Sequence, residues 1–570
     1  MEFLAPLRKG TELNQVEKWK LERNPLDVYD SVINTYSKNG VESILSVEGE
    51  QERLKWVGLY PQKQGGDAFM MRVKVPGGRI TAQQAEKLGE LSLRYAKSPS
   101  SDAVFGNCYC DITTRQSIQL HWLPIGDIPT IWHELEGVGL TTVQACGDSS
   151  RNVLCCPVSG IDANEIFDAY PIATAISEFF TGNREYSNLP RKFKISVTGC
   201  QEDCAQAEIN DIGMWPAKLE DGTLGFNLLV GGGLSDGPRM ASDIDVFVPL
   251  EQAVEATRGI AQLFGELVNR ENRGLSRMRY LVQELGPEGF RSELEKRVSF
   301  GMLPAGESLT KGYRGDHIGI HPQKEQDVFY AGLNVLVGRL KAPELIELAR
   351  LAATYGNSEI RLTTDQNAII SGISKDKLEE FLGEPVLKTI SPFPKPFERG
   401  AVACTGNEFC RFAIVETKAH AAKWAKAMDE KFSSLIEGET RLNGSATSSW
   451  QDKVQRQEQI SSQVVRMHFS GCPASCAQPQ IGDIGFRGDT AHRNGEIVEA
   501  VDIGLGGSLG ADASFIDWVE GAVPSDEVPQ ALVGLFEGYF GQRREGESFR
   551  NWTRRVPNPQ LRKILSSGAK

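Results

Sequence analysis

The stretch Thr198-Gly-Cys-Gln-Glu-Asp-Cys-Ala-Gln-Ala-Glu-Ile-Asn-Asp-Ile-Gly213 returns later in the chain as Ser470-Gly-Cys-Pro-Ala-Ser-Cys-Ala-Gln-Pro-Gln-Ile-Gly-Asp-Ile-Gly485. Each copy is followed by a strand-like segment that ends in a glycine run, and then by a Val-Pro pair that opens a predicted helix, at Pro249 and Pro524. Because these matches keep the same order and nearly the same offset, we interpret the chain as a tandem duplication.

A second repeated unit precedes each of these segments. Its first copy reads as strand, helix, strand and helix over 69–75, 81–96, 110–120 and 128–138. Its second copy repeats the first three elements over 328–337, 342–355 and 359–370. Thr113-Thr-Arg-Gln116 aligns with Thr363-Thr-Asp-Gln366 without a gap. The sequence therefore predicts an α+β protein in which two small α+β units and two glycine-ended α/β units are related by a pseudo-twofold axis.

The composition excludes several classes of protein. A net charge of -13 argues against nucleic acid as the main ligand. No apolar run approaches the ~18–20 residues of a membrane span. Residues 1–20 lack the apolar core of a signal peptide, so we expect a cytoplasmic protein. Eleven cysteines do not resemble a secreted disulfide framework, and clustered thiols in a reducing compartment favour metal binding.

Four cysteines of the second half form two short pairs. They read C-x5-C, a gap of about sixty residues and C-x3-C, and they are Cys404, Cys410, Cys472 and Cys476. Four thiolates are what a cubane iron–sulfur cluster requires. Zinc also accepts four cysteines, usually with tighter spacing in both pairs. The spacing alone leaves a redox cluster and a zinc site open.

The first half carries cations instead. Arg115 stands at the repeat position of Asp365, and Arg151 lies in a Gly-Asp-Ser-Ser-Arg-Asn segment. Lys192 and Lys194 are two residues apart on a predicted strand and so share one face. Mutual repulsion of about 1 kcal/mol makes an anionic ligand the better explanation than a solvated basic edge. A metal centre facing a cationic pocket indicates multi-electron reduction of a small oxyanion, with the cations binding the anion and organising protons.

These segments resemble the siroheme nitrite and sulfite reductases. Residues 404–410 and 471–476 are similar to that family's cluster motif, and the resemblance extends over 20–555. The motifs similar to its anion pocket are 113–116, 147–152 and 189–194. The resemblance implies a 4Fe–4S cluster bound by the cysteine quartet, with Cys476 also ligating the siroheme iron. It further implies that Arg115, Arg151, Lys192 and Lys194 face the substrate, with Arg115 and Arg151 also available to the siroheme carboxylates.

With this resemblance the chain divides into six segments. They are an N-terminal helical segment (1–65), a ferredoxin-like half-domain (66–145), a siroheme-type α/β domain with the anion pocket (146–275), a helical linker (276–325), a second ferredoxin-like half-domain (326–395) and the siroheme/4Fe–4S domain with the cluster ligands (396–570).

The electron donor and the substrate complete the prediction. The glycine runs lack a G-x-G-x-x-G pattern opening a helix, so we expect no flavin or nicotinamide site. The resemblance implies reduced ferredoxin as the donor, and an acidic partner requires a basic docking patch. Residues 404–418 and 465–468 resemble nitrite reductases, whereas Lys192 with Lys194 and residues 69–78 resemble sulfite reductases. Nitrite to ammonium is the first expectation and sulfite to sulfide the second; a zinc-stabilised, non-catalytic binding protein is the alternative from another class.

The remaining cysteines and histidines have weaker assignments. Cys155, Cys156, Cys200 and Cys204 stand at repeat positions near those of the quartet, which leaves a second cluster or packing cysteines open. His121 and His468 lie in strand-like runs and are interpreted as structural. His317 and His321 fall in the linker and indicate nothing definite.

Overall fold

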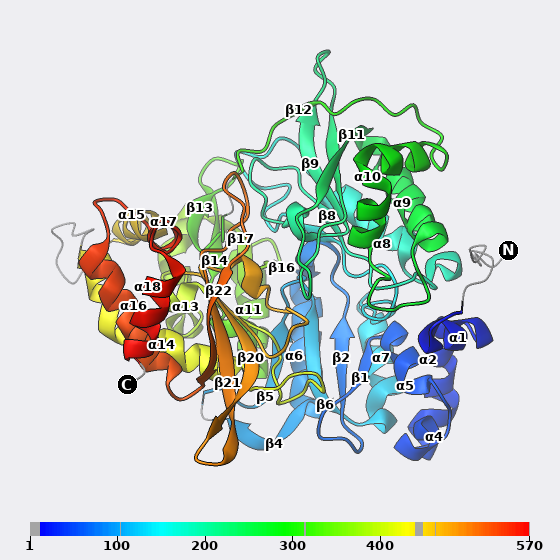
Figure 1. The fold of residues 1–570 in the computed structure, drawn as a ribbon, viewed down its shortest axis with the longest axis horizontal. Coiled ribbons are helices and arrows are strands. Elements are labelled where there is room, and N and C mark those ends of the chain that lie inside the picture. The colour runs from blue at the N-terminus through cyan, green and yellow to red at the C-terminus, as the bar shows by residue number, and fades with distance from the viewer. Residues whose placement is uncertain (1–11, 103, 313–314, 439–448, 462, 569–570) are drawn as a thin grey trace.

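The computed structural model is drawn in Figure 1. The residues that it describes are 12–102, 104–312, 315–438, 449–461 and 463–568. Parts of the predicted N-terminal segment, linker and C-terminal domain lie outside them. The described residues form four sheets in two related pairs, which confirms the predicted duplicated α+β fold. The domain boundaries listed above stay a prediction.

The first pair of sheets belongs to the two ferredoxin-like units. One sheet runs β1 (Leu59–Pro61), β2 (Phe69–Val73), β6 (Ile118–Leu123), β5 (Gly106–Ile112) and β15 (Arg339–Lys341), with β4 (Lys97–Asp102) also on β5. The other runs β13 (Gly319–Pro322), β14 (Val328–Leu333), β17 (Ala368–Ser374), β16 (Glu359–Leu362) and β3 (Arg79–Thr81). Each sheet therefore ends in a strand donated by the other repeat, because β15 pairs with β5 and β3 pairs with β16, both antiparallel.

Two helices pack against each other at the centre of this pair. They are α6 (Ala82–Tyr95) and α11 (Ala342–Tyr355), and both contribute to one hydrophobic core that spans the two sheets. A Cβ on Gly89 of α6 would lie 2.5 Å from Ile346 Cγ1 of α11, so only glycine permits this approach. The two ferredoxin-like units thus form a single packed body.

The second pair of sheets carries the α/β units. One runs β11 (Ser242–Pro249), β10 (Leu224–Val230), β9 (Ile212–Lys218), β8 (Ile195–Val197) and β7 (Leu154–Cys155), with β12 (Glu307–Ser308) on β9. The other runs β18 (Ala401–Ala403), β19 (Met467–Ser470), β20 (Ile484–Arg493), β21 (Glu496–Leu505) and β22 (Asp517–Pro524). In each sheet the three strands β7–β8–β9 or β18–β19–β20 are parallel and the others antiparallel. The chain leaves neighbouring parallel strands at the same edge of the sheet.

Helices cover these sheets and the N-terminal side of the molecule (Figure 1). Those that pack on the two α/β sheets include α8 (Tyr170–Phe180), α9 (Ala253–Leu267) and α10 (Met278–Glu295) on the first sheet's side, and α14 (Lys418–Gly438) and α16 (Val528–Gln542) on the second's. The others are α1 (Gln15–Glu22), α2 (Val28–Ser31), α3 (Ser37–Asn39), α4 (Val41–Leu45), α5 (Glu50–Arg53), α7 (Ile128–Glu136), α12 (Leu378–Leu382), α13 (Pro396–Arg399), α15 (Trp450–Ser461), α17 (Phe549–Arg555) and α18 (Asn558–Gly568). Among the described helices, none has the length and apolar character needed to cross a bilayer.

Two predicted strands are in fact hairpins. The segments 110–120 and 359–370 each contain two strands joined by a tight turn, in which Gln116 and Gln366 have φ of +53° and +65°. Alternation of apolar residues continues across each turn, so the pattern alone conceals it. Both glutamines reach into the other repeat: Gln116 Nε2 donates to Leu362 O and Gln366 Nε2 to Ile112 O, each at 2.9 Å.

The predicted helical linker is helical only in its first half. After α10 the chain runs on without another helix through β12 to β13 within the described residues. This extended half crosses from the first α/β unit to the second ferredoxin-like unit, because β12 pairs with β9 and β13 pairs with β14.

A buried ion pair fastens the two repeats at their exchanged strands. Arg339 Nε donates to Asp111 Oδ1 at 2.8 Å and Nη2 to Asp111 Oδ2 at 3.2 Å, while Nη1 donates to Glu408 Oε2 at 2.8 Å. Both side chains of the Arg339–Asp111 pair are at most 2% exposed. Although burial opposes ionisation, Arg339 holds the pKa of Asp111 well below its usual value.

We expect Arg339→Met to lower the free energy of unfolding by about 3–5 kcal/mol, because it leaves the Asp111 carboxylate buried without its main partner. Urea unfolding of the full-length protein measures the change. Arg350→Met removes an exposed ion pair with Glu384 and should cost at most about 1 kcal/mol. Equal shifts for the two variants would contradict the role assigned to the buried pair.

Candidate active site

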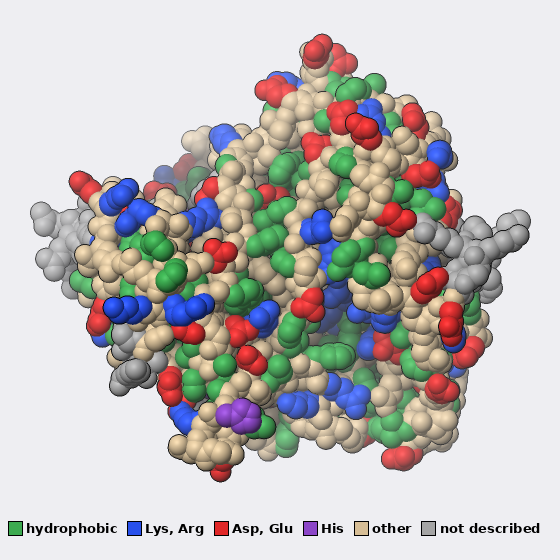
Figure 2. Space-filling model, viewed as in Figure 1, with side chains coloured by type: hydrophobic (Ala, Val, Ile, Leu, Met, Phe, Trp, Pro, Cys, Tyr) green, Lys and Arg blue, Asp and Glu red, His purple; other side chains and the backbone are tan. Residues whose placement is uncertain are grey.

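A cavity of about 640 Å³ contains every predicted site residue in its lining. The cysteine quartet comes from the second repeat, whereas the predicted cations Arg115, Arg151, Lys192 and Lys194 come from the first. In Figure 2, Lys and Arg side chains are visible deep in a hollow near the middle of the face shown. The duplication therefore brings together two kinds of side chain that are far apart in the sequence.

Parallel strand pairing positions the quartet. Cys404 and Cys410 follow β18, and Cys472 and Cys476 follow β19. Because β18 and β19 are parallel and in register at Ala403 and Phe469, both ligand loops leave the same edge of the sheet. Cys476 is exposed and the other three thiols are partly exposed, so all four are open to a group bound in the cavity.

The spacing of the quartet suits a cluster better than a single ion. Among the described residues, the groups of three or more potential metal ligands within 4.8 Å of one another do not include any quartet cysteine. One zinc ion draws its thiolates much closer, since Zn–S bonds of roughly 2.3 Å place tetrahedral ligands roughly 3.8 Å apart. Four thiolates held further apart leave room for a cubane between them.

Hydrogen bonds hold the ligand loops in place. Gly471 N donates to Cys404 Sγ at 3.2 Å, a contact of the kind that tunes iron–sulfur potentials. Thr114 of the first repeat donates through Oγ1 to Cys476 O at 2.9 Å. The turn that carries Arg115 therefore also contacts the loop that carries Cys476.

The two predicted arginines are anchored by backbone and amide oxygens. Arg115 donates from Nη1 to Asn210 Oδ1 at 2.8 Å and from Nη2 to Asn152 O at 2.7 Å. Its Nε is buried without a partner in the described part of the chain. Arg151 donates to Gly147 O from Nε at 3.0 Å and from Nη2 at 2.8 Å. Burial, followed by the charge of Arg151, lowers the pKa of Arg115 to about 9.

Lys192 and Lys194 lack anionic partners. They flank Phe193, which bridges to Ser150, and both line the cavity. Within the described residues neither ammonium group makes a hydrogen bond or an ion pair. Burial and then Arg277 lower the pKa of Lys192 to about 7, and burial and then Lys192 lower the pKa of Lys194 well below its usual value. An anion in the cavity would remove this penalty on the charged forms.

Sequence reasoning missed further cations of the cavity. Arg72 and Arg273 also line it, in addition to Arg191, which lies in the anion-pocket motif 189–194 singled out above. Arg72 donates from Nη1 to Cys146 Sγ at 3.2 Å, and Arg273 donates to both oxygens of Asp148, at 2.6 and 3.1 Å. Arg72 could have been predicted from the sequence, because it alternates with apolar residues along β2. Arg273 lies in the segment after α9, and no local pattern points to it.

The histidines of the strand-like runs have structural contacts, as predicted. His121 Nε2 lies 3.0 Å from Asp111 Oδ2 and is buried. His468 Nδ1 lies 3.1 Å from Gln478 O and is also buried. Neither lines the cavity.

Fold and cavity together define a class of protein: a duplicated α+β redox protein with thiolates on one wall of its site and cations on the other. Residues 146–301 match the family described as nitrite and sulphite reductase 4Fe-4S domain. Residues 60–138 and 321–386 match the nitrite/sulfite reductase ferredoxin-like half domain.

Similar proteins cover nearly the whole chain. The assimilatory ferredoxin-dependent nitrite reductase of Haloferax mediterranei is 40% identical over 94% of this chain and 90% of its own. The ferredoxin–nitrite reductase of Synechococcus elongatus is 37% identical over 93% and 97%. The structure of the Mycobacterium tuberculosis NirA protein superposes with a TM-score of 0.84 at 30% identity, covering 96% of this chain and 98% of that one. The chain belongs to the nitrite and sulfite reductase family, and its cofactors are a 4Fe–4S cluster and siroheme.

The residues of the cavity fit both groups. Four thiols open to one space match the ligand count of a cubane cluster. The unpaired Arg115 Nε and the unpartnered lysines match a tetrapyrrole that carries many carboxylates.

We expect Thr114→Val to accelerate loss of the cluster, because it removes the hydrogen bond to Cys476 O, worth about 1 kcal/mol, while conserving shape. Iron release to a chelator, followed by absorbance, measures the rate. The matched control is Thr364→Val, which removes the repeat-related bond to Cys204 O at 3.0 Å. Identical iron release from the two variants would argue against a cluster beside Cys476.

Proposed function

We propose that this protein reduces nitrite to ammonium, with reduced ferredoxin as the electron donor and the cavity between the repeats as the active site. The observation that carries this proposal is the meeting in one cavity of four cysteine thiols and of four cations, Arg115, Arg151, Lys192 and Lys194, that form no ion pair with a described side chain. The relatives named as ferredoxin-dependent nitrite reductases support the choice of donor and substrate.

The cysteine quartet has the role of passing electrons from the donor into the active site. Cys404, Cys410, Cys472 and Cys476 would hold the 4Fe–4S cluster, and Cys476, the most exposed of the four, would also be the one available to the siroheme. When bound, siroheme supplies an iron that takes the anion and passes electrons to it one at a time. Arg115 and Arg151 hold carboxylates of the tetrapyrrole as well as facing the substrate.

The lysines bind the substrate and handle protons. Reduction of nitrite to ammonium takes six electrons and releases both oxygens as water, so protons must be delivered at each stage. Lys192, with its pKa lowered to about 7, exchanges a proton readily near neutral pH. Lys192 and Lys194 also offset the negative charge of the oxyanion in a site removed from bulk water.

The second lysine favours sulfite as a second substrate. Sulfite is largely dianionic near neutral pH and nitrite is monoanionic, so Lys194 adds more to the binding of sulfite.

We expect the purified protein to have a higher kcat/KM for nitrite than for sulfite. Lys194→Asn should lower kcat/KM for sulfite about tenfold relative to nitrite, because a charged contact contributes about 1.5–3 kcal/mol. Oxidation of reduced ferredoxin, followed with each anion, measures both values.

The control for this comparison is Lys218→Asn, which changes an exposed lysine outside the cavity lining on β9. Its substrate ratio should equal that of the unchanged protein. A kcat/KM for sulfite well above that for nitrite would overturn the proposed substrate order. An unchanged ratio in Lys194→Asn would remove the role given to Lys194.

Ferredoxin is expected to dock where the cluster loop meets solvent. Lys63 and Arg411 are exposed beside this loop, and Phe412 next to Cys410 is 71% exposed. Lys63 N donates to Phe409 O at 2.9 Å, so the lysine is fixed against the loop. An exposed apolar side chain on a loop that also carries or contacts two exposed cations suits an acidic partner, although the protein as a whole carries a charge of -13.

We expect Lys63→Glu to raise KM for ferredoxin several-fold at low ionic strength and less at high ionic strength, because it reverses a charge at the docking surface. Steady-state rates against ferredoxin concentration measure this effect. Rates with a small viologen donor should not change. Lys296→Glu, at an exposed position on the end of α10, is the matched control. Equal KM values for the two variants would place the docking surface elsewhere.

The cytoplasm is the proposed compartment. None of the eleven cysteines forms a disulfide, as is usual in a reducing environment. Cell fractionation with an antibody to the protein checks this assignment, and recovery in an exported or organellar fraction would contradict it.

A further inference from the structure

A second group of cysteines occupies the first repeat at the positions of three quartet cysteines. Gln116 Oε1 accepts from Cys155 N at 3.1 Å, as Gln366 Oε1 accepts from Ala403 N at 2.9 Å, so Cys156 corresponds to Cys404. The repeated sequence motif pairs Cys200 with Cys472 and Cys204 with Cys476. Because β7 and β8 are parallel, Cys156 and Cys200 follow strands that end at the same edge of their sheet.

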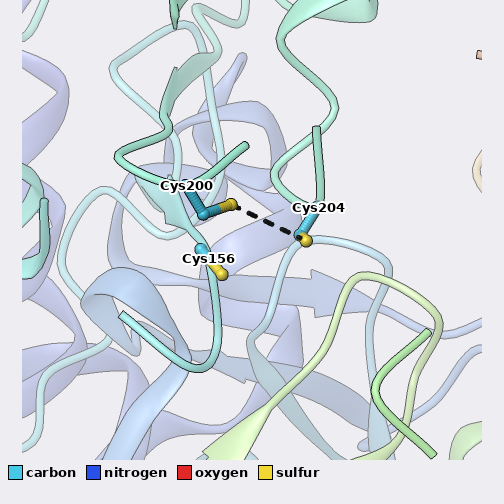
Figure 3. Close-up of side chains that lie close together, drawn as sticks. All are labelled: Cys156, Cys200 and Cys204. Carbon is cyan, nitrogen blue, oxygen red and sulfur yellow. Dashed lines mark hydrogen bonds between the residues drawn. The ribbon is translucent and has the colours of Figure 1, made fainter. Parts of the chain in front are cut away.

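This group is far more compact than the quartet. The Sγ atoms of Cys156, Cys200 and Cys204 all lie within 4.8 Å of one another, and those of Cys200 and Cys204 are 4.0 Å apart (Figure 3). Tetrahedral zinc thiolates, with Zn–S bonds of roughly 2.3 Å, have sulfur atoms roughly 3.8 Å apart. The group therefore matches the ligands of one ion and leaves no room for a cubane.

His317 supplies a fourth ligand. Its Nε2 lies 3.0 Å from Cys204 Sγ, while its Nδ1 faces Tyr330 Oη at 3.4 Å. A ring nitrogen toward the sulfurs, with the other nitrogen on a polar partner, is the usual arrangement of a metal-binding histidine. The residue comes from the extended half of the linker, which explains why no local cysteine spacing includes it.

The surrounding structure fixes His317 in this position. A Cβ on Gly332 would lie 1.6 Å from His317 O, so only glycine allows β14 to approach this segment. His317 itself has a φ of +59°. The preceding residue, Asp316, receives hydrogen bonds from Arg399 at 2.7 and 2.8 Å. Contacts on both sides of His317 thus offset the conformational free energy that a histidine loses in the left-handed region.

The cysteine loops are equally well anchored. Arg361 Nη1 donates to Pro157 O at 3.1 Å and Ser159 O at 2.8 Å, which holds the loop after Cys156. Thr364 Oγ1 donates to Cys204 O at 3.0 Å. Apolar side chains close the site, including Val158, Ile161 and Ile369. Three buried thiols beside one half-buried imidazole are a soft, preorganised ligand set with few other uses.

We propose that Cys156, Cys200, Cys204 and His317 bind one Zn²⁺ ion in a structural Cys3His site. Binding displaces the three thiol protons and joins each sulfur and Nε2 to the ion, with no change of oxidation state. A carboxylate oxygen of Glu202 also lies within 4.8 Å of Cys204 Sγ and a ring nitrogen of His317. We leave Glu202 out of the ligand set because its Oε2 accepts from Gly315 N at 3.1 Å, and because three thiols and one imidazole already complete a tetrahedral site. The ion would join the first α/β unit to the linker segment at His317, whose other ring nitrogen contacts Tyr330 of the second ferredoxin-like unit.

The test is the metal content of the full-length holoprotein, expressed with zinc in the medium and purified without chelator. We expect about one zinc and about five irons per chain. Cys204→Ser and His317→Ala should lose at least nine-tenths of the zinc and keep the iron. Cys108→Ser, which changes a half-buried cysteine outside the group, should keep both.

A variant that replaces one zinc ligand by another tests the proposal even if the substitutions above impair folding. His317→Cys should retain the zinc, and X-ray absorption at the zinc edge should change from three sulfurs and one nitrogen to four sulfurs. Three outcomes overturn the proposal: less than one-tenth of a zinc per chain in the unchanged protein, zinc retained in both Cys204→Ser and His317→Ala, or about nine irons per chain, which would mean a second cluster instead.

Discussion

The exchange of edge strands between the two repeats is the constraint on which the rest of the structure depends. β15 completes the first ferredoxin-like sheet and β3 completes the second. Between the two repeats, Arg339 of β15 donates to Asp111, and Gln116 of the first hairpin turn donates to Leu362. Because backbone hydrogen bonds fix the register of these strands, the relative position of the repeats is set to within a residue. The turns of the hairpins then reach the cysteine loops of the opposite repeat.

The same scaffold arranges two groups of cysteines in different ways. In both α/β units, parallel strands release their chains at one edge, so cysteines that follow those strands meet there. In the second repeat the thiols stay apart and open to the cavity, as a cluster requires. In the first they are buried and close together. What separates the sites is the space between the sulfurs and access to solvent, not the spacing of cysteines in the sequence.

Electrostatics explains why the cations of the cavity indicate an anionic ligand even though the protein as a whole is acidic. Most surface charges are screened and reveal little about a ligand. Lys192 and Lys194 are different, because burial depresses the pKa of each and neither forms an ion pair with a described side chain, although Asp211 partly offsets the effect at Lys194. A bound anion would favour the charged forms, so the cavity suits an anionic ligand. Net charge, averaged over the chain, conceals this local excess.

The sequence by itself determined the duplication, the paired motifs and the residue types at the site, because short-range spacing and repeated patterns survive without coordinates. Cys404, Cys410, Cys472 and Cys476 could be singled out in this way, and so could Lys192 and Lys194. The tertiary structure alone decided which elements exchange, that 110–120 is a hairpin, and that Arg72 and Arg273 share the cavity. It also decided that His317 lies beside Cys204, a residue of the buried cysteine group more than a hundred residues away in the chain. Such contacts depend on strand register and the close approach of backbones at positions such as Gly332, and these are properties of the packed whole.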